Sequence, residues 1–124
     1  MLFRSILESP FGVFESKIFS YKKQKIEEKK YTKWFDYDKI KNSPCVRTRR
    51  QGDYLTVNSE GGRKKLNRIF IDEKIPAEMR DRLPVVAVGS EILWIPGGRM
   101  NEKYKITSTT GRVLELHYQG GALA

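Results

Sequence analysis

The sequence predicts a small α+β fold, in which one or two short helices pack on a mixed or antiparallel sheet. Short runs rich in β-branched and aromatic residues, separated by turn residues, are typical of strands. One longer segment, residues 64–74, instead carries apolar residues at helical spacing. At 124 residues the chain can bury a core and fold as one domain, or as one domain with a small appendage.

Seven short segments carry the pattern of strands. They are residues 13–21, 33–38, 46–49, 54–57, 85–88, 92–95 and 113–118. A turn at Gln51-Gly52-Asp53 separates the third from the fourth, and Gly89-Ser90 separates the fifth from the sixth as a hairpin.

The predicted helix over residues 64–74 has one apolar face. Leu66, Ile69 and Phe70 lie at positions i, i+3 and i+4, which predicts a buried stripe. We expect Val86 and Trp94, on two of the predicted strands, to be buried with this stripe beneath the helix.

Prolines and turn residues divide the chain. Pro76 suits the first position of a second short helix, which Leu83-Pro84 ends. Asn42-Ser43-Pro44 breaks the chain before the third predicted strand. We therefore predict a linker or preceding-domain segment with short strands over residues 1–44, and a C-terminal domain over residues 45–124.

The positive charge of the chain is unevenly spread. The formal net charge is +9. Residues 41–68 hold eight Lys or Arg and only two Asp or Glu, whereas residues 69–124 hold seven of each. A polyanion is the natural partner of such a patch. A solvated surface that aids solubility explains the composition equally well.

Features of several function classes are absent from the sequence. There is no Ser-Gly-Gly-x-Asp-Ser pyrophosphatase loop and no G-x-x-x-x-G-K-[ST] loop, and residues 59–64 lack the spacing of a phosphate loop. His117 and Cys45 alone are too few for zinc, so we expect no metal, no cofactor and no catalytic residue. A single cysteine fits a cytoplasmic location, and no apolar run approaches the ~20 residues that span a membrane.

A dense group of basic residues follows Cys45. On a strand, Arg47 and Arg49 project from one face, and guanidiniums at this spacing fit successive phosphates. Further basic side chains lie near the N-terminus of the predicted helix, where free backbone N–H groups attract phosphate. The candidate RNA-binding residues are Arg47, Arg49, Arg50, Arg63, Lys64, Lys65, Arg68 and Arg99.

The alternative for these arginines is a structural ion pair. The carboxylates that could hold them are Asp36, Asp38 and Asp53. We expect at least one arginine to be held in this way. Asp53 in particular is expected to be a structural partner and not a catalytic acid, because it follows a turn glycine and can satisfy local donors.

An ordered set of motifs runs through the same region. It consists of Arg47-Thr-Arg-Arg-Gln-Gly-Asp53, Arg63-Lys-Lys-Leu-Asn-Arg-Ile-Phe-Ile-Asp-Glu-Lys-Ile-Pro76, Arg80-Asp81, Ile92-Leu-Trp94 and Gly98-Arg99. Together these closely resemble the C-terminal domain of bacterial tRNA(Ile)-lysidine synthetases. Residues 31–40 look like the segment that precedes it, so the resemblance covers about residues 31–118. Gln51, where the family commonly has proline, and Pro96-Gly97 are departures from the pattern.

The resemblance implies a role in tRNA modification. Enzymes of this family use ATP to activate the wobble cytidine of a tRNA(Ile) anticodon, and the amine of lysine then displaces AMP to give lysidine. The ATP loop lies in an N-terminal catalytic domain that this chain lacks, so Met1 would mark the start of a fragment or of one product of a split gene. This domain is then expected to grip the tRNA acceptor stem, since duplex RNA is recognised mainly through backbone and shape.

Two other functions stay open on the sequence. One is a different RNA-binding module, such as a ribosome-associated one. The other is a structural or dimerisation domain that forms a homodimer through Trp34, Phe35 and Tyr37, because a severed interface leaves an exposed apolar patch.

Overall fold

The computed structural model describes residues 3–9, 12–26 and 29–120. The chain folds as two compact units, each built around its own sheet. The first unit comprises residues 1–41 and 104–124, and the second comprises residues 42–103.

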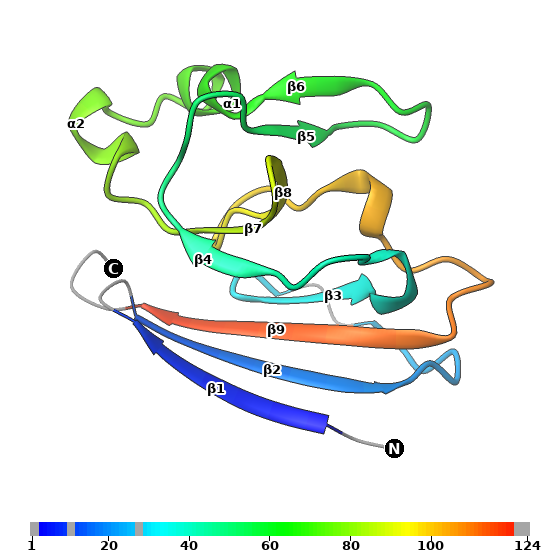
Figure 1. Ribbon diagram of the computed structural model, residues 1–124. Coiled ribbons are helices and arrows are strands. Elements are labelled where there is room, and N and C mark those ends of the chain that lie inside the picture. Colours follow the sequence, from blue (N-terminus) through cyan, green and yellow to red (C-terminus); the bar gives the residue numbers. More distant parts are fainter. Residues whose placement is uncertain (1–2, 10–11, 27–28, 121–124) are drawn as a thin grey trace. The chain divides into compact units, whose positions relative to one another are not determined.

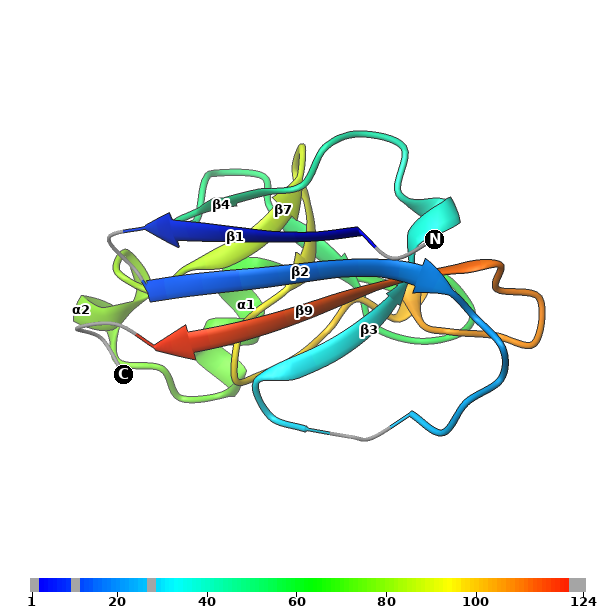
Figure 2. The same cartoon turned by 90° about the horizontal axis from the view of Figure 1, so that it is seen from below.

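The first unit is a four-stranded sheet with the strand order β1-β2-β9-β3, in which every pair is antiparallel (Figures 1 and 2). Its strands are β1 (Phe3–Ser9), β2 (Gly12–Ser20), β3 (Thr32–Asp36) and β9 (Arg112–Gly120). β2 and β9 pair along their full length, from Gly12 opposite Gly120 to Ser20 opposite Arg112. A short 3-10 helix, η1 (Tyr37–Lys39), follows β3.

The sheet of the first unit has one strongly buried face. Because side chains alternate along a strand, residues opposite one another on paired strands share a face. Phe35 pairs with Leu114, and Leu114 pairs with Ile18 on β2. Phe35 is completely buried and Leu114 is 5% exposed. The opposite face carries Trp34 and Glu115, which are only half-buried.

The second unit is a five-stranded sheet with the order β4-β7-β8-β5-β6, joined by two short helices. Its elements are β4 (Cys45–Arg47), β5 (Tyr54–Thr56), β6 (Arg63–Lys65), α1 (Leu66–Asp72), α2 (Ala77–Arg80), β7 (Val85–Val88) and β8 (Glu91–Trp94). The β5–β8 pair is parallel and the other pairs are antiparallel, so the sheet is mixed. A second 3-10 helix, η2 (Glu102–Tyr104), begins at the end of this unit, and its last residue, Tyr104, belongs to the first unit.

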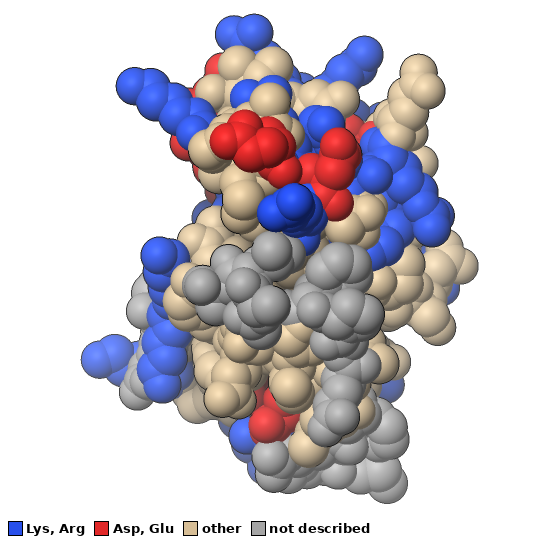
Figure 3. Space-filling view, turned by 90° about the vertical axis from the view of Figure 1, so that its left-hand side faces the viewer, with Lys and Arg blue, Asp and Glu red and all other residues tan. Residues whose placement is uncertain are grey.

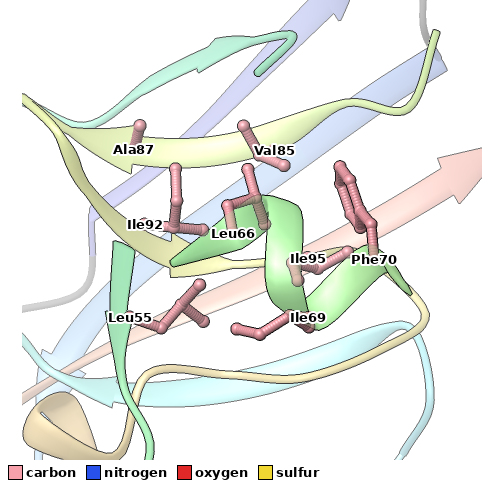
Figure 4. Packing of buried hydrophobic residues seen from close by; sticks show 8 residues of the cluster. All are labelled: Leu55, Leu66, Ile69, Phe70, Val85, Ala87, Ile92 and Ile95. Atoms are coloured by element: carbon pink, nitrogen blue, oxygen red, sulfur yellow. The ribbon is translucent and has the colours of Figure 1, made fainter. Parts of the chain in front are cut away.

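The core of the second unit lies between α1 and its sheet (Figure 4). The buried cluster consists of Leu55, Leu66, Ile69, Phe70, Val85, Ala87, Ile92 and Ile95. The predicted stripe of α1 is confirmed, since its three members are at most 1% exposed. The expectation that Val86 and Trp94 join them is wrong. Both are buried but lie outside this cluster, and Val86 points away because Val85 and Ala87 already occupy the helix-facing side of β7.

The predicted α+β class is confirmed, with differences at the level of elements. The chain forms two sheets where we expected one. Residues 63–65 are a strand paired with β5 and not the first helical turn, so α1 begins only at Leu66. No strand was predicted over residues 3–9, where the structure has β1. Pro76 precedes α2 as its N-cap residue, one position before the expected place.

The division of the chain also differs from the expected one. The break predicted at residues 42–44 falls at the start of the second unit, which begins at Asn42. Residues 104–124, expected within a domain over 45–124, belong to the first unit. The reason is the pairing of β9 with both β2 and β3.

Candidate nucleic-acid interface

Arg47 is held in a buried ion pair. The Arg47 side chain is 9% exposed, and its Nη1 and Nη2 atoms donate to Asp53 Oδ2 at 2.9 Å and Asp53 Oδ1 at 2.8 Å. Nη2 also donates to the Gly89 carbonyl at 2.8 Å, and Nη1 to the Thr48 carbonyl at 2.9 Å. The hydrogen bonds from Asp53 raise the pKa of Arg47 above its usual value. This arginine therefore ties β4 to two turns, and its donors are turned inward.

The expected pairing of an arginine with Asp53 is confirmed. The expectation that Arg47 and Arg49 project from one strand face is wrong, because β4 ends at Arg47. Asp38 is held by Arg112, outside the basic group, through Nε at 2.8 Å and the backbone N–H at 3.0 Å.

Arg49 bridges two other parts of the second unit. Its Nε donates to Asp81 Oδ1 at 2.8 Å, and its Nη1 donates to Asn67 Oδ1 at 3.0 Å. The hydrogen bond from Arg49 lowers the pKa of the Asp81 carboxyl. Arg49 is half-buried, whereas Asp81 lies in solvent with 76% of its side chain exposed. A ligand phosphate would therefore compete with a single exposed carboxylate for this guanidinium.

Lys64 and Arg68 share one carboxylate on α1. Lys64 Nζ pairs with Asp72, and Arg68 Nε lies 3.2 Å from Asp72 Oδ1. The hydrogen bond from Lys64, with a further contribution from Arg68, lowers the pKa of Asp72. The helix start is also occupied, because the Leu66 N–H donates to the Asp53 carbonyl at 2.9 Å. This N–H group is therefore not available to a phosphate, and the helix start lies at Leu66 and not at Lys64, where we expected it.

Four of the candidate basic residues have no acidic partner within residues 3–9, 12–26 and 29–120. They are Arg50, Arg63, Lys65 and Arg99. Two of them, Arg63 and Lys65, stand on β6, which is an edge strand of its sheet.

Arg63 and Lys65 share one face of the β5–β6 hairpin. Lys65 lies opposite Tyr54 and Arg63 lies opposite Thr56, so all four side chains project from the same side. The Arg63 guanidinium stacks over the Tyr54 ring, with its central carbon 4.7 Å from the ring centroid. Stacking fixes the plane of the guanidinium and leaves its edge donors free for an anion.

The other two unpaired arginines approach the ends of the same hairpin. Arg99 Nη2 donates to the carbonyl of Val57, the residue after β5, at 3.2 Å. The backbone N–H of Arg50 donates to Asp53, the residue before β5, at 2.7 Å. We call Tyr54, Arg63 and Lys65, with Arg50 and Arg99 at the two ends, the hairpin surface.

Several residues at this site carried no prediction. The sequence does contain a signal for Asp72, since it stands four positions after Arg68, the spacing of a helical ion pair. Tyr54 follows from the hairpin register once residues 63–65 are recognised as a strand. Asn67 and Asp81 meet Arg49 only through the tertiary fold, so local sequence carries no signal for them.

Other candidate chemistry is limited in the described parts of the chain. No group of three or more His, Cys, Asp or Glu within them could hold a metal ion. No helix among them is long and apolar enough to cross a membrane. Cys45 is exposed, and His117 Nδ1 lies 2.6 Å from the Thr32 hydroxyl. On the side drawn in Figure 3, Asp and Glu side chains lie among the Lys and Arg side chains.

Fold and site together define a small α+β domain with an exposed cationic sheet edge. Residues 45–116 match the family model described as the TilS substrate C-terminal domain, so the chain belongs to this family of C-terminal domains of tRNA(Ile)-lysidine synthases. It is also similar to a solved structure described as the crystal structure of the TILS C-terminal domain. The TM-score is 0.76 at 29% identity, and 97% of this chain and 98% of the other are covered.

Full-length relatives carry the same region. The chain is 50% identical over 88 residues to the tRNA(Ile)-lysidine synthase of Caldanaerobacter subterraneus subsp. tengcongensis, covering 71% of this chain and 19% of that protein. It is 41% identical over 90 residues to the tRNA(Ile)-lysidine synthase of Clostridium tetani, covering 73% of this chain and 19% of that protein. The chain thus corresponds to about a fifth of the length of these relatives.

Proposed function

We propose that this chain is the tRNA-gripping part of a tRNA(Ile)-lysidine synthase and binds the acceptor stem through the hairpin surface. In the whole protein, an N-terminal catalytic domain would use ATP and lysine to convert the wobble cytidine of tRNA(Ile) to lysidine. This chain would supply RNA affinity and orientation, in the cytoplasm, with no catalytic residue, metal or cofactor of its own.

One observation carries the proposal, namely the pair of unpaired cations on the exposed edge strand β6. Arg63 and Lys65 are exposed, project from the same face and have no carboxylate partner among the described residues. Guanidinium and ammonium groups are the donors that bind phosphate oxygens. An acceptor stem is a duplex, whose backbone such donors contact without reading bases.

The eight candidate residues do not contribute equally to RNA binding in this proposal, because some of them already have partners within the protein. The two Nη atoms of Arg47 donate to Asp53 and to two carbonyls, so its role in the proposal is to hold β4 and not to contact RNA. Arg49, Lys64 and Arg68 would each have to share or leave a carboxylate to reach a phosphate. The hairpin surface needs no such exchange and is therefore the primary contact in the proposal.

The homodimer alternative loses one of its contacts. Phe35, the central residue of the expected apolar patch, is completely buried, and Trp34 and Tyr37 are half-buried. A measurement of the mass in solution over a range of concentrations tests this alternative directly. A concentration-dependent mass without RNA affinity would favour it over RNA binding.

The test of the proposal is binding to an RNA hairpin with the duplex of a tRNA acceptor stem, measured at several salt concentrations. Lys65→Ala and Arg63→Ala should weaken binding and lower the slope of log affinity against log salt by about 0.7–0.9 each. Arg82→Ala removes the same charge from an exposed position after α2, which is not part of the hairpin. Equal losses in all three variants would leave only a diffuse basic surface and contradict the proposal.

A further inference from the structure

The half-buried face of the first unit's sheet carries a row of interacting side chains. Trp34 on β3, Glu115 on β9 and Lys17 on β2 are successive register partners. The Trp34 indole N–H donates to Glu115 Oε1 at 2.9 Å, and Lys17 Nζ lies 3.6 Å from Glu115 Oε2. The Trp34 ring also meets Phe19 in an edge-on arrangement with centroids 5.0 Å apart. These contacts hold a large aromatic ring on a face that is only half-buried.

A small cavity opens beside this tryptophan. Its volume is about 200 Å³, and its lining residues are Lys25, Lys29, Thr32, Trp34 and Glu115. Pockets for drug-sized ligands measure about 300–1,000 Å³, so this one suits a single ring system. Its lining combines an aromatic ring, a hydroxyl, two ammonium groups and one carboxylate.

The connection between β2 and β3 brings positive charge to this cavity. Residues 22–33 contain six lysines and two glutamates. Within the described ranges, Lys22 and Lys25 have no acidic partner. Four of the eight cations in residues 41–68, namely Arg47, Arg49, Lys64 and Arg68, are held in ion pairs with Asp53, Asp81 and Asp72. The first unit is therefore a second place where cations are available to a polyanion.

We propose that this cavity binds one unpaired nucleotide of a single-stranded RNA. The base stacks against Trp34, and the Lys25 ammonium group contacts a flanking phosphate. Glu115 keeps unused lone pairs beside its bonds to Trp34 and Lys17, so it accepts from an amino group of the base. The inference rests on the proposed function for its RNA ligand, but adds a site in the other unit for RNA without duplex structure.

The composition of the lining favours a nucleotide over a simple anion. A phosphate site is built from cations and N–H donors, and a carboxylate in the lining opposes a bare anion. A base has a π-face for the tryptophan and amino groups for the carboxylate. Sheets that combine an aromatic platform with a basic groove bind single strands with little sequence preference.

Tryptophan fluorescence gives a direct readout. Only Trp34 and Trp94 are present, and Trp94 is completely buried, so a stacked base quenches Trp34 alone. The whole chain is titrated with a short oligoadenylate, with AMP and with inorganic phosphate. We expect quenching by the oligoadenylate, weaker quenching by AMP and none by phosphate. Quenching by AMP as strong as by the oligomer indicates a free-nucleotide site, and it overturns the single-strand assignment.

Two variants test the cavity, and a third controls for the loss of a positive charge outside it. Trp34→Leu should weaken oligoadenylate binding by about fivefold or more, the lower limit for loss of one base–aromatic stack. Since this variant loses the bond to Glu115, its thermal unfolding is compared with that of the parent chain. Lys25→Ala leaves the sheet intact and should lower the salt slope by about 0.7. Lys22→Ala removes the same charge from the same connection but not from the cavity lining, and should have a smaller effect.

The outcomes distinguish this site from the hairpin surface. If Trp34→Leu and Lys25→Ala bind oligoadenylate as the parent chain does, the cavity assignment is overturned. The proposed function still stands in that case, provided that duplex binding depends on Lys65. If duplex binding does not depend on Lys65 and Arg63 but the oligoadenylate still quenches Trp34, the proposed function is contradicted. Single-strand binding at the cavity then stands by itself. Absence of binding to either RNA removes both.

Discussion

Arg47 and Asp53 form a two-contact ion pair that is almost fully buried, with the Arg47 Nη atoms 2.8 and 2.9 Å from the two carboxylate oxygens. Asp53 also accepts the Arg50 N–H, and the Arg47 Nη2 also reaches the Gly89 carbonyl. Asp53→Ala would leave a buried cation without its partner. We expect the free energy of unfolding to fall by about 3–5 kcal/mol, measured by urea denaturation.

Arg47→Met is the matching variant, because it removes the cation and retains an unbranched apolar stem. Its RNA affinity, measured where the variant is folded, should remain near that of the parent chain with the same salt slope. A slope reduced by about 1 in the folded Arg47→Met protein would place Arg47 on a phosphate and contradict the structural role given to it.

Phe70 supports the core of the second unit. It is completely buried between α1 and the sheet, and Phe70→Ala should lower the free energy of unfolding by about 3–5 kcal/mol. Ile71 is the control on the same helix, because it is 50% exposed. Ile71→Ala should change stability by no more than about 0.5 kcal/mol. Similar losses in both variants, measured by chemical denaturation, would show that the helix face is assigned wrongly.

Asp81 restrains Arg49 at the surface. Asp81→Asn keeps the shape of the side chain but removes the charge that holds the guanidinium, so Arg49 becomes available to RNA phosphate. We expect a higher affinity for acceptor-stem RNA and a salt slope larger by about 0.7–0.9. Glu78→Gln removes one negative charge from neighbouring α2, where no described cation pairs with Glu78. An equal gain in Glu78→Gln would mean that net charge alone is responsible.

Stability should fall in acid because of the carboxylates paired with the basic group. The pKa of Asp72 is lowered by Lys64 and Arg68, and that of Asp81 by Arg49, in both cases below the ordinary 3.8. Folding therefore favours the ionised forms of these two carboxylates, which stabilises the folded state at a pH above 3.8. This stabilisation is lost as the pH falls through the lowered pKa values of the folded state. Urea unfolding of Asp72→Asn should show a weaker dependence on pH in this range. Glu73→Gln, one residue further along, should retain the dependence of the parent chain.

Local periodicity predicted the parts of the fold that depend on nearby residues. The stripe of Leu66, Ile69 and Phe70 could be predicted because a helix brings positions three and four apart to one side. The same reasoning placed Lys64 and Lys65 in the helix, although pairing with β5 holds them in a strand. Strand pairing is a long-range interaction, and a run of basic residues has no apolar alternation to reveal it.

The basic group was visible in the sequence, but the state of each side chain was not. The distance between Arg47 and Asp53 is six residues, and a turn joins them, so a structural pair could be expected. The Asp81 carboxylate that accepts from Arg49 lies 32 residues further along the chain, at the end of α2, and only the folded second unit brings the two together. Charge counts along the sequence therefore overestimate the number of cations that are free to bind RNA.

The central position of β9 has a consequence for synthesis. The second unit is one continuous stretch, residues 42–103, and can fold as soon as that stretch has left the ribosome. The sheet of the first unit must wait for residues 112–120, since β9 lies between β2 and β3 in the strand order and pairs with both. Until then β2 and β3 both present unpaired backbone edges, which are templates for pairing with other chains. A nascent or truncated chain that stops before Arg112 would therefore carry a folded second unit beside an aggregation-prone first one.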